Sequence, residues 1–289
     1  MKTHQIFVTL TIMSLCITSL NSGSNGNCYY IGNEREAVLI DAGLSCRETE
    51  KRMKRLGLQI EKVRAIFVSH EHTDHITGIP VLSQKYQLPV YITANTLLQS
   101  RISVKEHLVH SFTANIPLAI GGLLVTAFTK LHDAVDPHSF TISADGIVVG
   151  VFTDIGSPCK NVMEHFMKCN AAFLEANYDE NLLMNGNYPF HLKKRIASDN
   201  GHLSNDQALK LFLEYKSSFM SHLILSHLSK NNNTPELVQA LFDLNAGNTA
   251  ITVASRYKET AVFNIDGSNI PLNKVKSSIV SNPLQLSLF

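Results

Sequence analysis

A short segment crowded with metal-binding side chains is the feature that most constrains what this sequence can fold into. At the end of the β-rich run Ala65–Ser69 the chain continues His-Glu-His-Thr-Asp-His. In an extended chain His70 and His72 point to the same side, and a turn after them can bring Asp74 and His75 to a second point. Crowded imidazole and carboxylate groups cost free energy unless something binds them. The segment therefore predicts the beginning of two metal sites.

The composition limits which metals the chain is expected to bind and how it could contact nucleic acid. Imidazole with carboxylate suits zinc, iron or manganese. The five cysteines are scattered without a Cys-x-x-Cys pair, which fits neither a disulfide framework nor a cysteine zinc site, so we expect reduced thiols. Lys+Arg 25 against Asp+Glu 24 gives a net charge of +1, so any contact with nucleic acid must come from local patches.

Short strands alternate with helices along the 289 residues, which predicts an α/β fold. Expected strands are 28–31, 37–40, 65–69, 108–110, 123–128, 140–143, 147–152, 171–174, 222–225, 251–253 and 261–264; expected helices are 47–56, 159–168, 204–215 and 234–245. Asp145-Gly146 is a strong hairpin signal. Ser204 and Thr234 are typical helix N-caps.

The N-terminus allows two interpretations. Residues 1–20 resemble the charged and apolar regions of a secretory signal, but no clean cleavage site follows and hydroxyl residues interrupt the apolar run. In the alternative, 14–20 is a buried first strand and 1–13 is an extension or a mis-called start, with Met13 as the native beginning. We expect the second, and with it a cytoplasmic protein; no other segment is apolar enough to predict a membrane span.

The pattern His70-x-His72-x-Asp74-His75 after an apolar strand resembles the signature of the metallo-β-lactamase superfamily of hydrolases. The resemblance implies a four-layer αββα sandwich. It also implies three later ligands, each in a motif of its own: His132, Asp154 and His227. One metal would be held by His70, His72 and His132, a second by Asp74, His75 and His227, with Asp154 shared. Asp41 matches the early aspartate of the superfamily, which supports the ligands from behind.

Two cations roughly 3.5 to 4 Å apart stabilise the attacking and leaving oxygens and lower the pKa of a water between them. Zinc is the first choice for both ions, with manganese or iron as alternatives. Asp74 is expected to orient or deprotonate that water as well as to bind metal.

Five further motifs resemble the YycJ/WalJ family and imply a DNA exonuclease domain over 14–267. They are Ser22-Gly-Ser-Asn-Gly-Asn-Cys-Tyr-Tyr30, His132-Asp-Ala-x-x-Pro137, Glu175-Ala-Asn-Tyr-Asp179, Gly201-His-Leu-Ser-Asn205 and His227-Leu-Ser-Lys-x-Asn-Asn233. In the first, Ser24 and Asn25 belong to a glycine-rich loop that can cradle a phosphate or simply form a tight turn. His202 is expected to protonate a leaving oxygen or hold the phosphate. Expected substrate contacts are Lys193, Lys194, Arg195 and Lys230.

The last segment, 268–289, is predicted to be a flexible tail. It ends in Gln285-Leu286-Ser287-Leu288-Phe289, which resembles the peptide by which bacterial DNA-processing proteins bind the sliding clamp. Gln285 would supply a hydrogen bond, and Leu286, Leu288 and Phe289 would enter an apolar pocket. The alternative is an apolar tail packed on the protein's own core.

Three functions remain open from the sequence. The first is a DNA exonuclease in repair or replication, which acts on DNA rather than RNA and not at a membrane. The second is a ribonuclease, small-molecule phosphodiesterase or thioesterase of the same superfamily. The third is a clamp-associated regulator without activity.

Overall fold

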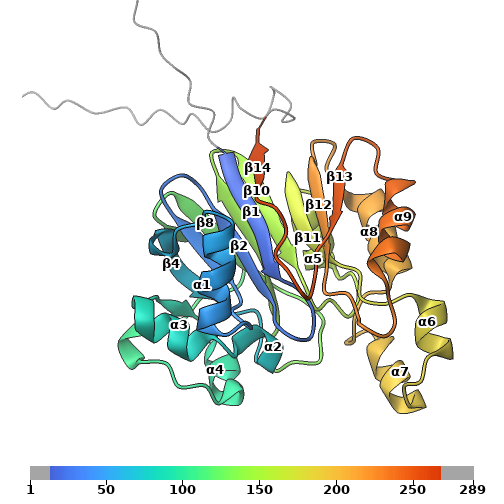
Figure 1. Cartoon of the computed structure of the whole chain (residues 1–289), viewed down its shortest axis with the longest axis horizontal. Helices are drawn as coiled ribbons and strands as arrows, with labels where there is room; N and C mark the ends of the chain where they lie inside the picture. Colours follow the sequence, from blue (N-terminus) through green and yellow to red (C-terminus); the bar gives the residue numbers. More distant parts are fainter. Residues whose placement is uncertain (1–13, 268–289) are drawn as a thin grey trace, which may run out of the picture.

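Two β-sheets packed face to face form the centre of the molecule, and helices cover their outer faces (Figure 1). The structure is a computed structural model that describes residues 14–267. Within that range the first sheet has seven strands in the order β14 (Phe263–Asp266), β1 (Ser14–Asn21), β2 (Cys28–Gly32), β3 (Ala37–Ile40), β4 (Val63–Phe67), β5 (Val90–Tyr91) and β6 (Val109–His110). The second has β13 (Ala250–Val253), β12 (His222–Ser226), β11 (Ala171–Glu175), β10 (Ile147–Phe152), β9 (His138–Ala144), β8 (Leu123–Thr129) and β7 (Leu118–Ile120).

The helices divide between the two sheets. The first sheet is covered by α1 (Cys46–Arg55), α3 (Ile79–Tyr86) and α4 (Ala94–Ser100), and the second by α5 (Lys160–Phe166), α8 (Asn205–Tyr215) and α9 (Pro235–Asp243). Three short helices, α2 (Thr73–Ile76), α6 (Glu180–Asn185) and α7 (Phe190–Ile196), lie at one end of the sandwich (Figure 1), and 3₁₀ turns occupy Ile60–Lys62 and Glu106–Leu108. The expected αββα arrangement is confirmed.

The strands are apolar on both faces because both faces are covered. In β3, Val38 and Ile40 pack into the core between the sheets, whereas Ala37 and Leu39 pack into the core under the helices of the first sheet. All four side chains are buried. This double burial explains why several strands read as continuous apolar runs rather than as alternating patterns.

The sheet topology directs several strand ends to the same place. In the first sheet β3 and β4 are parallel, and in the second β10, β11 and β12 are parallel. Strand β8 also runs in the direction of β10, because each is antiparallel to β9. The carboxyl ends of these strands are where open α/β sheets place their functional residues.

The local predictions are confirmed, with small shifts in bounds. Strand β1 is the buried first strand expected over 14–20, and it lies between β2 and β14. The Asp145-Gly146 turn joins β9 to β10 with both residues at positive φ, 50° and 83°. Side chains of Ser204 and Thr234 cap α8 and α9. Helices α2, α3, α4, α6 and α7 and strands β5 and β7 were not predicted from the sequence.

One strand ends earlier than predicted, and the reason is functional. Strand β4 was expected to reach Ser69 but ends at Phe67, because the Ser69 N–H donates to the Asp41 carboxylate at 2.8 Å instead of to a neighbouring strand. The predictions for 1–13 and 268–289 lie outside the described residues. None of the described helices combines the length and apolar character needed to cross a membrane. All five cysteines are free.

His165 on α5 should make the fold acid-sensitive in a defined window. Its ring stacks on Phe128 with centroids 4.0 Å apart, and burial lowers its pKa from 6.5 to about 4. The folded state therefore prefers neutral His165, so its contribution is complete above pH 6.5 and is lost as the pH falls towards 4. We expect His165→Phe to lose less unfolding free energy than wild type between these pH values.

Urea unfolding at several pH values measures this difference. His107→Phe, at an exposed position, is the matched control and should keep the pH dependence of the wild type. Parallel pH profiles for His165→Phe and wild type would contradict the prediction.

Candidate active site

Three histidines from two strand ends form the first part of the site. His70 Nε2 lies 3.0 Å from His72 Nδ1, and His132 Nε2 lies 3.4 Å from the same atom. The other nitrogen of His132 donates to the Gly201 carbonyl at 3.0 Å, which leaves Nε2 free as a lone-pair donor. Burial lowers the pKa of His132 to about 3 and that of His70 well below its ordinary value. Both rings are therefore neutral, the form that binds a metal.

A second group of donors lies beside the first. Asp74 Oδ2 is 3.5 Å from Nε2 of both His75 and His227. Burial alone would raise the pKa of Asp74, but the two histidines hold it well below its ordinary value. His227 Nε2 is buried and has no hydrogen-bond partner among residues 14–267. A buried nitrogen left in this way is expected where a ligand completes the site.

Asp154 lies between the two groups. Its Oδ2 is 3.1 Å from His75 Nε2, and its Oδ1 is 3.9 Å from His132 Nε2. Burial opposes ionisation, yet the charges of His227 and His75 lower its pKa well below the ordinary range. Asp154 Oδ1 also lies 3.4 Å from His227 Nδ1. The structure thus brings all seven residues predicted as ligands to one place, with Asp154 near histidines of both groups.

The donor chemistry of both groups fits divalent metal ions. Each group offers at least three nitrogen or oxygen atoms within 4.8 Å of one another. A tetrahedral zinc ion with bonds of about 2.0 to 2.1 Å would need ligand atoms only a little more than 3 Å apart, as found here. Around these donors, Asp41, Asp154 and Glu175 are buried carboxylates, and bound cations would offset their charge.

Asp41 supports the second group from behind. Its carboxylate accepts hydrogen bonds from Ser69 N–H and Ser69 Oγ, both at 2.8 Å, and lies 2.7 Å from His75 Nδ1. The ring of His75 is thereby fixed with Nε2 towards the donors. Asp41, Asp154 and His227 also have positive φ values of 59°, 53° and 55°. Such backbone is costly for residues other than glycine and is concentrated at functional sites.

Glu175 is a site residue that the sequence reasoning missed. It ends β11, and its fully buried Oε1 accepts hydrogen bonds from Nδ1 of His202 at 2.7 Å and of His227 at 3.1 Å. The other oxygen accepts from Ile155 N–H at 2.6 Å. Burial would raise the pKa of Glu175, but the His202 charge and these hydrogen bonds lower it. A carboxylate at the end of an apolar strand was the available signal.

The glycine-rich loop is tied to the site by Asn27, which was also missed. Its Nδ2 donates to Asp74 Oδ2 at 3.1 Å, and its Oδ1 accepts from Gly23 N–H at 2.9 Å. On the other side the Asp74 backbone lies so close to Gly43 that an added Cβ would meet the Asp74 carbonyl oxygen at 1.7 Å. Asp74 is therefore held from both sides by closely packed loops.

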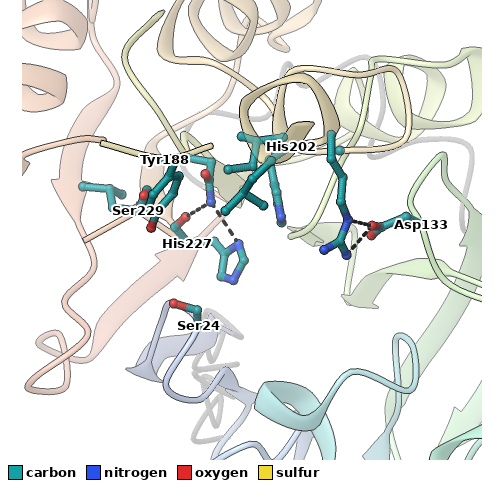
Figure 2. Close-up of a pocket in the computed structure, with 12 residues that line it drawn as sticks. Ser24, Asp133, Tyr188, His202, His227 and Ser229 are labelled. Carbon is teal, nitrogen blue, oxygen red and sulfur yellow. Dashed lines mark hydrogen bonds and ion pairs between the residues drawn. The ribbon is translucent and has the colours of Figure 1, made fainter. Parts of the chain in front are cut away.

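A pocket of about 220 Å³ opens beside the donors (Figure 2). Figure 2 shows Ser24 on one side of His227, with Tyr188, Ser229 and His202 on the other. The residues that line the pocket are Ser24, Asp133, Asn177, Tyr188, Leu192, Arg195, Ile196, Gly201, His202, His227, Leu228 and Ser229. Because Glu175 holds Nδ1 of His202, the other ring nitrogen of this partly exposed residue is the one available for a ligand.

The predicted substrate contacts divide into two sets. Ser24 and Arg195 line the pocket, and Arg195 pairs with Asp133 at 2.6 Å. The others do not line it. Asn25 Nδ2 donates to the Arg256 carbonyl and Lys193 Nζ to the Met184 carbonyl, both at 2.7 Å, which directs these groups to the backbone. Lys194 is exposed on α7, and Lys230 lines a different cavity. Gln285, Leu286, Leu288 and Phe289 lie outside the described residues.

Comparisons with known proteins agree with this geometry. A family profile described as "Beta-lactamase superfamily domain" matches residues 36–228, a range that contains all seven donors. The chain is 34% identical over 235 residues to the exodeoxyribonuclease YycJ of Bacillus anthracis, covering 78% of this chain and 87% of that protein. It is 32% identical over 223 residues to the exodeoxyribonuclease WalJ of Streptococcus pneumoniae, covering 75% and 83%.

A solved structure shows the same fold. The metallo-β-lactamase fold protein YhfI from Bacillus subtilis superposes with a TM-score of 0.66 at 17% identity, covering 87% of this chain and 99% of that one. The profile match and the extent of the similarity to YycJ and WalJ show that this chain is a hydrolase of the metallo-β-lactamase superfamily and belongs to the YycJ/WalJ family.

Proposed function

We propose that the protein is a metal-dependent exodeoxyribonuclease that hydrolyses phosphodiester bonds during DNA repair or replication. The observation that carries the proposal is that seven side chains able to bind metal meet beside a pocket lined by His202, one ring nitrogen of which is available to a ligand. The relatives named exodeoxyribonuclease, which match most of this chain, support DNA as the substrate. That substrate also agrees with the cytoplasmic location expected from the sequence.

The ligands of the two ions follow from the two groups of donors. His70, His72 and His132 would hold one cation and Asp74, His75 and His227 the other, with Asp154 between them. Zinc is the first choice, and manganese or iron are the alternatives. When bound, such cations activate water near neutral pH and stabilise the charge on the attacking and leaving oxygens of a phosphodiester.

The protein's own residues keep this site in one arrangement. Asp41 fixes the ring of His75, the Gly201 carbonyl fixes His132, and Glu175 fixes both His227 and His202. Hydrogen bonds to the outer nitrogen of a metal-binding histidine set its tautomer and direction. We propose that Asp74 binds metal and also orients the attacking water. No large rearrangement is then needed when substrate arrives.

His202 is proposed to transfer a proton to the leaving oxygen. Its Nδ1 is engaged by Glu175, so Nε2 is the atom that reaches a ligand in the pocket. Ser24 and Arg195 are proposed to contact the phosphate, since both line the same pocket. Arg195 would exchange part of its pairing with Asp133 for the substrate. Such local contacts would let a chain whose net charge is only +1 bind the phosphates of DNA.

Loss of one ligand should remove activity without unfolding the protein. We expect His72→Ala and Asp74→Ala to reduce hydrolysis of end-labelled duplex DNA to background, as chelation of the wild type should. Metal analysis of the purified variants should show fewer bound ions than in wild type.

His107→Ala, at an exposed position far along the chain from the donors, is the matched control and should behave like wild type. Parallel assays on RNA, a simple phosphodiester and a thioester test the other substrate classes of the superfamily. Full nuclease activity in both ligand variants would refute the site; preference for RNA or a thioester would replace the proposed substrate.

Glu175 and His202 should act as one unit. His202→Ala is expected to lower kcat by about 10²- to 10⁴-fold, the usual contribution of a general acid. Glu175→Gln should lower kcat in the same direction. At equal metal content, which corrects for the second contact of Glu175 with His227, the double variant should lose little more than His202→Ala alone.

The pH dependence of kcat distinguishes this role of Glu175 from a purely structural one. One limb of the plot of kcat against pH should disappear in His202→Ala, and the same limb should be shifted in Glu175→Gln. Both variants are compared with wild type at equal metal content. Independent, additive losses in the double variant would contradict the proposed pairing.

The C-terminal peptide is proposed to bind the sliding clamp. Deletion of Phe289 should abolish capture of the full-length protein on immobilised clamp, because the peptide would lose the side chain that fills an apolar pocket. Ser287→Ala is the matched control and should be captured like wild type. Equal capture of the chain without Phe289 would end this proposal.

A further inference from the structure

A second cavity, of about 120 Å³, adjoins the pocket beside the metal-binding groups. The two share Leu228 and Ser229 as a wall. The residues that line the second cavity are Ser22, Leu228, Ser229, Lys230, Asn233, Pro235, Ala254, Ser255, Arg256 and Tyr257. Lys230 and Arg256 are thus cations in a lining that, among the described residues, includes no carboxylate. The cavity is electrostatically suited to an anion.

Arg256 is held in place but retains an unused donor. Its Nη2 donates to Ser24 Oγ at 3.2 Å, and its backbone carbonyl accepts from Asn25 Nδ2 at 2.7 Å. Its Nη1 is buried and has no hydrogen-bond partner in the part of the chain that the structure describes. A buried donor on a charged group is expensive to leave unpaired. The planar guanidinium offers several N–H groups with the geometry that phosphate accepts.

The segment that carries Arg256 is rigidly attached to the first sheet. The Ser255 carbonyl accepts from Ser22 N–H at 3.2 Å, and the Tyr257 carbonyl accepts from Arg52 Nη2 at 3.2 Å. Arg52 is itself buried and bonds to β1 through the Leu20 carbonyl. The guanidinium is therefore pre-positioned, which lowers the entropic cost of binding a ligand.

The beginning of α9 contributes little to this cavity. Thr234 Oγ already accepts the Leu237 N–H, Pro235 has no N–H, and Glu236 adds negative charge to the first turn. The two cations, rather than the helix end, are therefore the groups at this cavity that would favour an anion.

We propose that the Lys230–Arg256 cavity binds the phosphate next to the scissile phosphate in a nucleic-acid strand. The inference rests on the proposed nuclease function and extends it from one phosphate to two. A strand carries one phosphate per nucleotide, and the cavities share a wall, so a strand in the first pocket would place a neighbouring phosphate at the second. Ser24 links them, since it lines the first pocket and bonds to Arg256.

Two substrates separate this subsite from the metal-binding groups. A labelled duplex oligonucleotide would occupy the Lys230–Arg256 cavity as well as the metal-binding groups. Bis(p-nitrophenyl) phosphate has a single phosphate and would occupy only the metal-binding groups. We expect Arg256→Gln and Lys230→Gln each to lower kcat/KM on DNA by about 10-fold or more, the effect of losing a charged hydrogen bond. Hydrolysis of the small diester should change by less than twofold.

Lys258→Gln is the matched control, because Lys258 is an exposed cation two residues from Arg256 that does not line the cavity. It should leave both substrates unaffected. Thermal unfolding of each variant checks the fold, and exposed Lys230 provides a test even if Arg256→Gln is destabilised.

Neutral methylphosphonate substitutions identify the phosphate that is bound. Each phosphate flanking the scissile one is replaced in turn, and 5′- and 3′-terminal phosphates are compared with hydroxyl ends. At one methylphosphonate position, kcat/KM of the wild type should fall by about the same factor by which Arg256→Gln lowers kcat/KM on unmodified DNA. The same methylphosphonate should not lower kcat/KM of Arg256→Gln any further, because the interaction with that phosphate has already been removed.

Wild-type kcat/KM on DNA in both variants would overturn the subsite alone. Equal losses on DNA and the small diester would also overturn it, because Arg256 would then act only by supporting the loop of Ser24. A wild-type protein that hydrolyses the small diester but neither DNA nor RNA would overturn the proposed nuclease function, and the subsite with it.

Discussion

Buried carboxylates paired with histidine rings are the interaction on which the rest of this structure depends. Asp41, Asp154 and Glu175 are almost completely excluded from solvent, and each lies within hydrogen-bond or ion-pair distance of a histidine that belongs to the candidate donors or lies beside them. Isolated charges of this kind would be prohibitively costly in a protein interior. Their mutual pairing lowers the cost, and bound cations would lower it further.

The sandwich provides the rigidity that such a network needs. The candidate donors follow the ends of strands or lie on α2 directly after β4, and the strands are packed on both faces against apolar cores. Three site residues tolerate positive φ angles because the surrounding hydrogen bonds determine their positions. The early end of β4 has the same origin, since Asp41 takes the Ser69 N–H that a longer strand would have used. Here the geometry of the site takes precedence over regular strand pairing.

The two arginines proposed to contact substrate, Arg195 and Arg256, are held in different ways. The guanidinium of Arg195 pairs with the Asp133 carboxylate. That of Arg256 donates to Ser24 Oγ, and its backbone belongs to the segment after β13 that is bonded to the first sheet. Both arginines therefore face cavities while keeping fixed positions. A protein built in this way can attract a polyanion locally without a large net charge, which would weaken the folded state by self-repulsion.

The sequence by itself predicted an α/β fold, the helix caps, the Asp145-Gly146 hairpin and the segment of candidate metal ligands from His70 to His75. Its resemblance to the superfamily predicted the αββα sandwich and the three later candidate ligands. Each of these depends on residues close together in the chain or on motifs with fixed order. Tertiary structure alone decided which distant groups meet: Glu175 with His202 and His227, Asn27 with Asp74, and Arg256 with Ser24. It also decided that Lys193 and Asn25 bond to backbone carbonyls. Such pairs depend on how the two sheets and their loops are packed, and no local pattern encodes the distance between residues 232 positions apart.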